Sequence, residues 1–497
     1  MGSAFVEHLG RLASTQGERV ALRDDAGELT YGALRERVTD VAAALTARGL
    51  AGKRVALLLP SSTEWVTAFL GCLASGATAV ALTELYAERE LESLVRASGA
   101  SAIVAGEATT EVATKVAGGA TVIAAEELRQ PRAGGEPTAT AAGGLLLFTS
   151  GTTGRPKGVP ITEESALHLG RTLGAAWGFE PEDVLLHVLP LHHVHGIGVS
   201  LVVGLLAGAT VRLLPRFDAE RVWDELGSAT ALMGVPTQHK KLFDAFDAAT
   251  PERRARWERS ARLLRLVTSG SAALPAALGE RWRALSGRYP LERYGMTEIG
   301  IVLSNPEHGE RRPGTVGKPL PGVSVRIVGD GGEPVSDGEP GELWVRAPTV
   351  FAGYDGDAAA TLASFRDGWF VTGDTAKCAD DGYLTILGRT SVDILKSGGE
   401  KLSALEIEDT LREHPGVAEV AVVGVPDETW GDAVVAVLVA RAGHAGALDE
   451  QSVRAWAKAR LTAYKVPKRV VVVDELPRNA LGKVMKNELV RRLREAS

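Results

Sequence analysis

The chain has 497 residues, of which 45% are hydrophobic and 24% are charged, with a formal net charge of −7. This length allows two or three domains with sizeable cores, and the charge gives no reason to expect nucleic acid or an acidic membrane surface as a partner. The two cysteines, Cys72 and Cys378, lie in unrelated segments, which predicts reduced thiols in a cytoplasmic compartment and excludes a disulfide framework or cysteine metal site.

At the N-terminus no basic segment precedes an apolar core, so no signal peptide is expected. Nowhere does an apolar run approach the roughly 20 residues of a membrane span. From residue 19 to about 125, helical and strand patterns alternate. Thr30 can cap a helix that ends near Gly49, and residues 54–59 and 78–82 are apolar runs typical of buried strands. This alternation predicts βαβ units around a buried parallel sheet.

A polar run directly follows the next expected strand, at residues 144–148. Residues 149–158 contain three glycines and four hydroxyl side chains. Glycine lets the backbone approach a ligand, and successive amides in such a turn form an anion nest that hydroxyls and a lysine extend. The run is not a P-loop, because Gly158 stands where that motif needs Ser or Thr; a flexible linker is the alternative. We therefore expect a phosphate clamp made of Thr149, Ser150, Gly151, Thr152, Thr153, Gly154 and Lys157.

Three histidines, His192, His193 and His195, follow the strand expected at residues 183–189. A tetrahedral metal site would need further ligands that face one point, and no Cys or His pair elsewhere in the sequence supplies them. A metal site is therefore disfavoured. His192 and His195 can equally be structural histidines.

Two further strand-to-loop steps lie at residues 232–237 and 264–275, on either side of a helix expected at 251–262. That helix is dense in Arg and Glu at helical spacing and should face solvent. In the second step a tight glycine turn precedes a helix that begins with Pro275. The small residues of this turn would let a flat ring lie against the backbone: Ser269, Gly270, Ser271, Ala272 and Ala273.

Residues 291–298 form the second polar signature. Tyr294 can stack on a base, Thr297 can donate to a phosphate oxygen, and Glu298 is suited to Mg²⁺, which prefers carboxylate and phosphate oxygens. The alternative is a buried tyrosine beside a Thr–Glu pair that caps a helix.

The remaining chain divides into a strand-rich region at residues 313–350 and a compact α+β domain of roughly 105 residues at the C-terminal end. In that domain helices are expected at 404–413 and 451–462, and strands at 417–425, 433–439 and 470–473. Near the end, Asn479 and Gly482 suit a tight turn that would project Lys483.

Five segments of the sequence resemble the signature motifs of the adenylate-forming superfamily: 148–159, 291–298, 369–374, 388–393 and 476–483. This superfamily includes acyl-CoA synthetases, luciferases and the adenylation domains of peptide synthetases, and the resemblance covers essentially the whole chain.

The resemblance implies an α/β plus α+β fold. Residues 1–389 would form a large N-terminal domain of parallel αβ-layered sheets with a β-rich subdomain, residues 390–393 a hinge, and residues 394–497 a small mobile C-terminal α+β domain. The segment after Arg389 is about one residue longer than in the commonest family pattern. Ser391 and Asp393 therefore both remain candidates for the hinge residue.

The resemblance also implies roles for single residues, with ATP and Mg²⁺ as cofactors and coenzyme A as co-substrate. Lys483, Thr297, Glu298 and His193 would be catalytic, and Glu298 would hold the metal ion. The acyl substrate would meet His193, Ser269, Gly270 and Arg293, whereas coenzyme A would pass Ser397, Gly398 and Gly399. Besides the phosphate clamp, the nucleotide would contact Ser271, Ala272, Ala273, Tyr294, Gly295, Met296, Asp374 and Arg389.

The implied reaction joins a carboxylic acid to coenzyme A through an acyl-adenylate, with release of pyrophosphate and AMP. Arg293 stands where many relatives carry a small or apolar residue, and its guanidinium would offer a fork for a second carboxylate. Together with residues 269–275 and 388–394, this arginine resembles malonyl-CoA synthetases, so malonate or methylmalonate is the expected acid.

Four alternatives remain open. Arg293 could pair with a neighbouring acid and take no part in selection. The protein could be a short-chain or aromatic monocarboxylate CoA ligase, an adenylation enzyme that loads a carrier protein, or a non-catalytic acyl-adenylate-binding protein. The last is disfavoured because Lys157, Glu298, Asp374 and Lys483 are all present.

Overall fold

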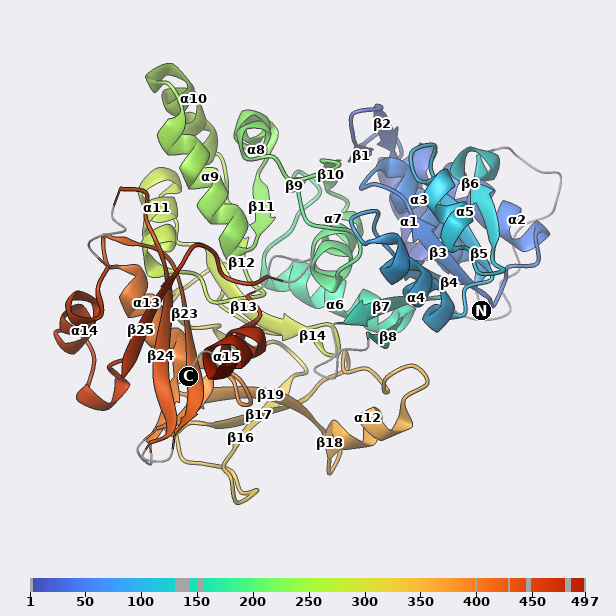
Figure 1. Ribbon diagram of the computed structural model, residues 1–497. Coiled ribbons are helices and arrows are strands. Elements are labelled where there is room, and N and C mark those ends of the chain that lie inside the picture. Colours follow the sequence, from blue (N-terminus) through green and yellow to red (C-terminus); the bar gives the residue numbers. More distant parts are fainter. Residues whose placement is uncertain are drawn as a thin grey trace. The chain divides into compact units, whose positions relative to one another are not determined.

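The computed structural model describes residues 3–129, 143–149, 156–397, 400–427, 430–443, 448–478 and 484–495 (Figure 1). By its internal contacts the chain divides into two compact units. The first unit comprises Met1–Ser324 and Val345–Phe370, and the second comprises Val325–Trp344 and Val371–Ser497. The two units are described separately below.

A six-stranded sheet in the first unit carries the phosphate-clamp segment. Its strand order is β6-β5-β3-β4-β7-β8, and all neighbours are parallel except β7 and β8. The apolar runs of the central strands are buried on both faces, as a parallel sheet requires. The strands are β3 (Arg54–Leu58), β4 (Thr78–Ala81), β5 (Ala102–Ala105), β6 (Thr121–Ala124), β7 (Gly144–Thr149) and β8 (Lys157–Thr162).

A nine-stranded sheet in the first unit has the order β15-β14-β13-β12-β11-β9-β10-β1-β2. The strands from β13 to β1 are parallel, and antiparallel strands close both edges. The strands are β1 (Val20–Arg23), β2 (Glu28–Thr30), β9 (Val184–His187), β10 (Thr210–Leu213), β11 (Ala231–Gly234), β12 (Leu266–Ser269), β13 (Leu291–Met296), β14 (Gly300–Ser304) and β15 (Lys318–Pro319).

Capping side chains fix the beginnings of several helices in this unit. Thr30 Oγ1 accepts from the Ala33 amide at 3.2 Å, and Ser62 caps the next helix in the same way. The helices are α1 (Ala4–Gln16), α2 (Tyr31–Ala47), α3 (Thr63–Ser75), α4 (Glu88–Ser98), α5 (Thr110–Val116), η1 (Ala125–Leu128), α6 (Glu163–Ala176), η2 (His195–Leu201), α7 (Val202–Leu206), α8 (Ala219–Glu225), η3 (Leu226–Ser228), α9 (Pro236–Ala248), α10 (Pro251–Ala261), α11 (Ala276–Ser286) and α12 (Ala358–Ala363).

Tryptophans make the core beneath α8, α9, α10 and α11, which Figure 1 shows gathered beside β11 and β12. The Trp223 ring is stacked on Trp257, with centroids 5.7 Å apart, and on Trp282, at 5.5 Å. All three side chains are fully buried. Such large rings stabilise the layer of helices that supports the carboxyl ends of β11 and β12.

The second unit ends in an α+β domain built on a sheet of order β22-β21-β24-β23, with β25 paired to β24. A further sheet, of order β16-β17-β19-β18 with β20 on β19, contains the strands along which the chain passes between the units. The strands of these two sheets are β16 (Ser324–Val328), β17 (Gly341–Arg346), β18 (Phe365–Arg366), β19 (Trp369–Cys378), β20 (Leu384–Arg389), β21 (Ile394–Ser397), β22 (Glu400–Ser403), β23 (Val417–Asp427), β24 (Gly431–Ala440) and β25 (Arg469–Val473). The helices are α13 (Ala404–Arg412), α14 (Glu450–Lys458), η5 (Ala463–Lys465) and α15 (Lys486–Glu495).

The predicted α/β plus α+β fold class is confirmed, as are the strands and helices expected from periodicity. Two helices were not predicted: α15, and η2, a π-helix that contains Gly196 and Gly198. Helical glycines argue against a helix from propensity alone. Gly196 is nevertheless required, because a Cβ there would overlap the Pro190 carbonyl. Among the helices that the structure describes, none is long and apolar enough to cross a membrane.

His239 links α9 to β12 in the buried core of the first unit. Its Nε2–H donates to the Thr268 carbonyl at 3.1 Å, so Nδ1 is the acceptor for Trp282 Nε1–H, also at 3.1 Å. Both ring nitrogens are therefore occupied in the neutral form. Burial lowers the pKa of His239 to about 4.

We expect acid to destabilise the first unit through His239. In the unfolded chain its pKa is near 6.5, so between pH 6.5 and about 4 the unfolded state binds more protons. Its contribution is fully present above pH 6.5 and is lost by up to about 1.4 kcal/mol per pH unit as the pH falls below it. Urea unfolding at pH 7.5 and pH 5.0 should show a smaller pH effect for His239→Gln than for wild type. The matched control is His168→Gln on α6; an unchanged pH effect in His239→Gln would contradict the assignment.

Candidate active site

The strands on both sides of the phosphate-clamp run are paired with each other. Thr149, the last residue of β7, lies opposite Lys157, the first residue of β8, in an antiparallel register. The two ends of the run are therefore fixed side by side at the edge of the sheet. The other predicted clamp residues, Ser150, Gly151, Thr152, Thr153 and Gly154, lie outside the described residues.

Lys157 belongs to a cluster that includes the predicted metal ligand Glu298. Lys157 Nζ lies 4.7 Å from the centre of the Tyr354 ring, and the Tyr354 hydroxyl donates to Glu298 Oε1 at 3.0 Å. The cation thus rests on the face of the aromatic ring whose hydroxyl orients the carboxylate. The cluster brings one cation and one carboxylate from distant segments to the same end of the first unit.

Thr297 and Glu298 lie in the tight turn that joins β13 to β14, with Thr297 half-buried and Glu298 buried. A Cβ on Gly295 would overlap the Gly300 carbonyl, so this turn requires glycine. A strand follows the turn, which excludes the alternative in which the Thr–Glu pair caps a helix.

The carboxyl ends of β12 and β13 bring together the predicted acyl-pocket residues. The strands are parallel, with Ser269 opposite Glu292 in register, so Ser269, Gly270 and Arg293 lie at the same edge. Ligands in open α/β sheets bind at this edge. Both Ser269 and Arg293 are buried, and Ser269 Oγ has no hydrogen-bond partner among the described residues.

Arg293 is the least compensated charge at this edge. It is only 4% exposed. Among the described residues no carboxylate pairs with it, and its Nε has no hydrogen-bond partner. Burial lowers the pKa of its guanidinium to about 9. A Cβ on Gly270 would overlap Arg293 Nη1, so the guanidinium occupies the space that a side chain at position 270 would fill.

His195 is the neighbour of the guanidinium. Arg293 Nη2–H can only donate, so His195 Nε2 accepts and the ring proton must be on Nδ1. Nδ1 in turn lies 3.5 Å from Ser271 Oγ. Burial, and next the charge of Arg293, hold the pKa of His195 well below 6.5. The imidazole is therefore neutral and orients the guanidinium without neutralising its charge.

The residues predicted to contact the nucleotide extend from the same edge. Ser271 adopts φ +67°, a left-handed conformation rare for a residue with a side chain, and the small residues Ser271, Ala272 and Ala273 are exposed. Tyr294, Gly295 and Met296, at the end of β13, are half-buried.

The two other histidines of the predicted cluster lie just before η2. The rings of His192 and His193 are 4.1 Å apart. His192 is buried, its Nε2 has no hydrogen-bond partner among the described residues, and burial lowers its pKa to about 3. His193 is half-buried. In the part of the chain that the structure describes, no group of three Cys, His, Asp or Glu side chains could hold a metal ion.

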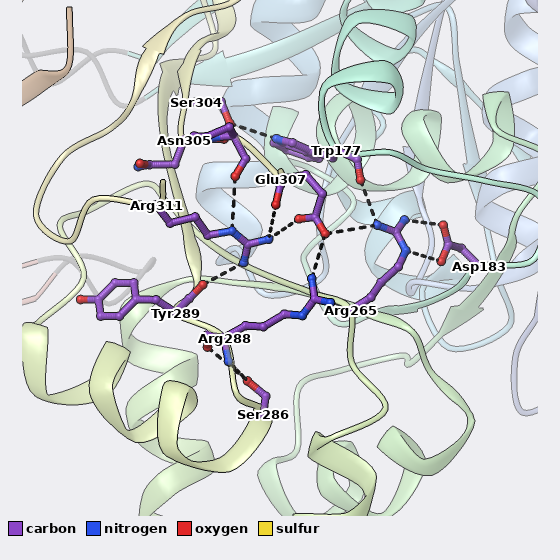
Figure 2. A network of polar contacts seen from close by, with 11 residues as sticks. Trp177, Asp183, Arg265, Ser286, Arg288, Tyr289, Ser304, Asn305, Glu307 and Arg311 are labelled. Carbon is purple, nitrogen blue, oxygen red and sulfur yellow. Dashed lines mark hydrogen bonds and ion pairs between the residues drawn. The ribbon is translucent and has the colours of Figure 1, made fainter. Parts of the chain in front are cut away.

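A network around Glu307 fixes the loop after β14 (Figure 2). The buried Glu307 carboxylate contacts three arginines: Arg311, Arg288 at 3.4 Å and Arg265 at 3.9 Å. Arg265 also pairs with Asp183, to which its Nε donates at 2.7 Å. The network thus joins four loops of the first unit, those that precede β9, β12 and β13 and the one that follows β14.

The anchored loop reaches the strand that carries Arg293. The Asn305 backbone amide donates to the Glu292 carbonyl at 3.0 Å, and Asn305 Nδ2 donates to the same oxygen at 3.1 Å. Glu292 Oε1 accepts from the Gly314 amide at 3.0 Å. Arg293 therefore follows a residue, Glu292, whose backbone carbonyl and side chain both form hydrogen bonds.

The second unit contains the predicted ribose-binding pair. Asp374 on β19 lies opposite Arg389 on β20, and Arg389 Nε is 3.1 Å from Asp374 Oδ1. Ser397, at the end of β21, is buried and its Oγ has no hydrogen-bond partner among the described residues. Gly398, Gly399 and Lys483 lie outside the described residues.

Sequence reasoning missed the partners of the predicted residues. Three contacts join segments far apart in the chain: the hydrogen bond from Tyr354 to Glu298, the ion pair of Glu307 with Arg265, and the contact of His195 with Arg293. The one available signal was Arg293 itself, directly before Tyr294 in the sequence, and it did not point to His195.

Comparison with known proteins gives the same picture for the whole chain. The malonate–CoA ligase ACSF3, mitochondrial, of Bos taurus is 39% identical and aligns with 96% of this chain and 89% of that protein. The malonate–CoA ligase of Arabidopsis thaliana is 37% identical over 97% of this chain and 87% of its own length. The crystal structure of ATP-bound MatB from Rhodopseudomonas palustris superposes with a TM-score of 0.90, at 35% identity and full coverage of both chains.

Two family models match this chain. The model described as AMP-binding enzyme covers residues 9–355, and the model of the AMP-binding enzyme C-terminal domain covers residues 406–483. The resemblance to adenylate-forming enzymes, and to malonyl-CoA synthetases among them, is therefore confirmed. The chain belongs to the AMP-binding enzyme family.

Proposed function

We propose that this chain is an ATP-dependent acid–CoA ligase that makes malonyl-CoA through a malonyl-adenylate. Methylmalonate, which carries the same pair of carboxylates, is included as a substrate. The high-coverage similarity to proteins named malonate–CoA ligase supports the reaction, and the ATP-bound neighbour supports ATP as the nucleotide.

The observation that carries the choice of acid is the buried Arg293 without a carboxylate partner among the described residues. An ion removed from water is unfavourable by several kcal/mol unless a partner meets it in good geometry. The second carboxylate of malonate is such a partner, and a guanidinium can bind it through two parallel hydrogen bonds. The alternative in which Arg293 pairs with a neighbouring acid finds no support among the described side chains.

In the first half-reaction a malonate oxygen attacks the α-phosphorus of ATP. The bond from that phosphorus to the bridging oxygen breaks, and pyrophosphate leaves. Such chemistry depends mainly on positioning and on charge neutralisation. We assign the phosphates to residues 149–157 with Thr297, the adenine to Tyr294 and residues 269–273, and the ribose to Asp374 and Arg389.

Glu298 would hold Mg²⁺, for which a carboxylate is a suitable ligand, and the ion would neutralise phosphate charge when bound. In the second half-reaction the sulfur of coenzyme A attacks the acyl carbon and AMP leaves. We assign Ser397, Gly398 and Gly399 to the path of coenzyme A, and His193 to the wall of the acyl pocket.

We also propose a domain boundary at the turn between β20, which ends at Arg389, and β21, which begins at Ile394. Residues 1–389 would form the large domain, residues 390–393 the hinge and residues 394–497 the mobile domain. A change of domain arrangement would let one site release pyrophosphate and then admit a thiol. A cytoplasmic location stays a prediction from the two free cysteines.

Arg293→Leu should abolish the preference for malonate. The second carboxylate would then enter the pocket without a counter-ion, at about 3–5 kcal/mol, which lowers kcat/KM by roughly two to three and a half orders of magnitude. Propionate and butyrate need no counter-ion, so their kcat/KM with Arg293→Leu should equal or exceed the wild-type value. Arg293→Lys should restore malonate only in part, because lysine keeps the charge but loses the fork.

The measurement is pyrophosphate release, with and without coenzyme A, over a panel of small acids. A wild-type enzyme that prefers acetate or butyrate to malonate would overturn the dicarboxylate assignment, and so would an Arg293→Leu variant that slows all acids equally. Acid-dependent pyrophosphate release without any thioester in the presence of coenzyme A would point to a carrier-loading enzyme instead.

Gly270→Ala tests the same pocket from the neighbouring strand, because Gly270 directly follows β12. The new Cβ would overlap Arg293 Nη1 and displace the guanidinium, so the ratio of kcat/KM for malonate over propionate should fall by at least about tenfold. Gly174→Ala on α6 is the matched control, because a Cβ there meets nothing within 4 Å. A ratio equal to wild type in Gly270→Ala would show that the guanidinium does not select the acid.

Lys483→Ala should separate the two half-reactions. Removing one cation that stabilises charge in the transition state slows a reaction by about 10²–10³-fold. We expect that loss in malonate-dependent pyrophosphate release, whereas thioester formation from synthetic malonyl-AMP and coenzyme A should stay within about tenfold of wild type. Lys458→Ala, at an exposed lysine of α14, is the control. Equal losses in both half-reactions would mean that Lys483 is structural.

A further inference from the structure

An ion cluster in the second unit joins three segments that the proposed mechanism does not connect. Lys486 is the first residue of α15. Its Nζ lies 2.5 Å from Asp393 Oδ1 and 2.6 Å from Glu408 Oε1. The three side chains are 12%, 14% and 7% exposed. The cluster therefore links the turn before β21, helix α13 and helix α15 away from most solvent.

The side chain, the amide and the carbonyl of Asp393 all form hydrogen bonds. Its Oδ2 accepts from the Arg389 amide at 3.0 Å, its own amide donates to the Arg389 carbonyl at 2.7 Å, and its carbonyl accepts from the Ala404 amide at 2.7 Å. A Cβ on Gly388 would overlap the Asp393 side chain. By contrast Ser391, the other candidate for the hinge residue, is exposed. The conformation of residues 389–393 therefore depends on where the Asp393 carboxylate is fixed.

Lys486 also stands three residues after Lys483 in the sequence. The described residues on both sides of that segment are tied to each other: the Met485 amide donates to the Pro477 carbonyl at 2.8 Å, and Arg478 pairs with Val484 in an isolated β-bridge. Arg478 also forms an ion pair with Glu419 on β23. The flanks of the Lys483 segment are thus anchored to the sheet at one end and, through Lys486, to Asp393 at the other.

Glu408 completes the cluster on α13. Its Oε1 also accepts from the Val422 amide on β23 at 2.8 Å, and its Oε2 lies 3.8 Å from Arg412. Replacing a buried ion pair by an apolar contact of the same size is often neutral or stabilising, so the cluster is weak evidence for a role in stability. In some proteins such buried ionic groups instead fix one geometry.

We propose that Lys486 is a positioning residue that makes Asp393 and the base of the Lys483 segment one rigid body, so that the hinge and Lys483 move together between the half-reactions. This inference rests on the proposed two-step ligase function. It assigns the hinge anchor to Asp393 and leaves Ser391 free to change conformation.

The test is Lys486→Met, which keeps the length of the side chain and removes its charge. Pyrophosphate release with malonate and ATP should fall by roughly 10- to 100-fold, as expected for a misplaced catalytic group. Thioester formation from synthetic malonyl-AMP and coenzyme A should change by less than about threefold, and Lys486→Arg should recover most of the first activity because it keeps the charge. Lys465→Met is the matched control: it removes an ion pair, 2.5 Å long, to Glu406 on the same helix α13, and this pair does not involve Asp393.

Two further measurements keep the outcome unambiguous. In a Lys483→Ala background, Lys486→Met should have no additional effect on pyrophosphate release, because both changes act through the same group. Amide hydrogen exchange at Asp393 and Ala404 should accelerate in Lys486→Met but not in Lys465→Met. Equal loss of both half-reactions, additive effects with Lys483→Ala, or unchanged exchange at Asp393 would overturn the inference. A wild-type enzyme without malonate-dependent pyrophosphate release would instead refute the proposed function, and the exchange result would still decide whether Lys486 holds Asp393.

Discussion

The carboxyl ends of β12 and β13, where we propose that the acid binds, contain one unfavourable arrangement: the Arg293 guanidinium is buried without a carboxylate beside it among the described residues. His195 accepts one hydrogen bond from Arg293 but brings no charge, and Gly270 supplies space by having no side chain. The Glu307 network, which ties Asn305 and through it Glu292, holds the backbone just before Arg293. A charge fixed in this way would discriminate between acids through the difference in their binding free energies. An acid with a second carboxylate compensates the charge, whereas a monocarboxylate leaves it buried and unpaired.

The second unit shows the opposite use of charge. Lys486 is fully paired, with Asp393 and Glu408 both within 2.6 Å. The proposed hinge motion would require Lys483 to keep a constant position relative to residues 390–393, and packed side chains alone tolerate small shifts. A shared lysine between two carboxylates permits few geometries, since any displacement leaves a buried charge unpaired. A buried guanidinium without a carboxylate, such as that of Arg293, is suited to select a ligand. A lysine paired with two carboxylates, such as Lys486, is suited to hold one geometry.

Local structure could be predicted from the sequence, and long-range contacts could not. Apolar runs predicted β3, β4 and β7, and Thr30 predicted the start of α2. Gly270 predicted the turn after β12, and the turn lies there. The pairing of Arg293 with His195, 98 residues apart, depends on the order of strands in the nine-stranded sheet. That order has no local signature. The same holds for Lys486 and Asp393, 93 residues apart, because each lies in a segment that reads as solvent-exposed on its own.

The position of Arg293 directly before Tyr294 has a consequence for how acid specificity can change. Successive side chains of a strand point to opposite faces, so one strand can present a group for the acid and a group for the base of the nucleotide on different sides. Tyr294 is half-buried at the open end of β13, whereas Arg293 is buried against Gly270 and His195. If the proposed roles hold, changing Arg293 and its two neighbours would alter the acid pocket and leave the nucleotide side of β13 as it is.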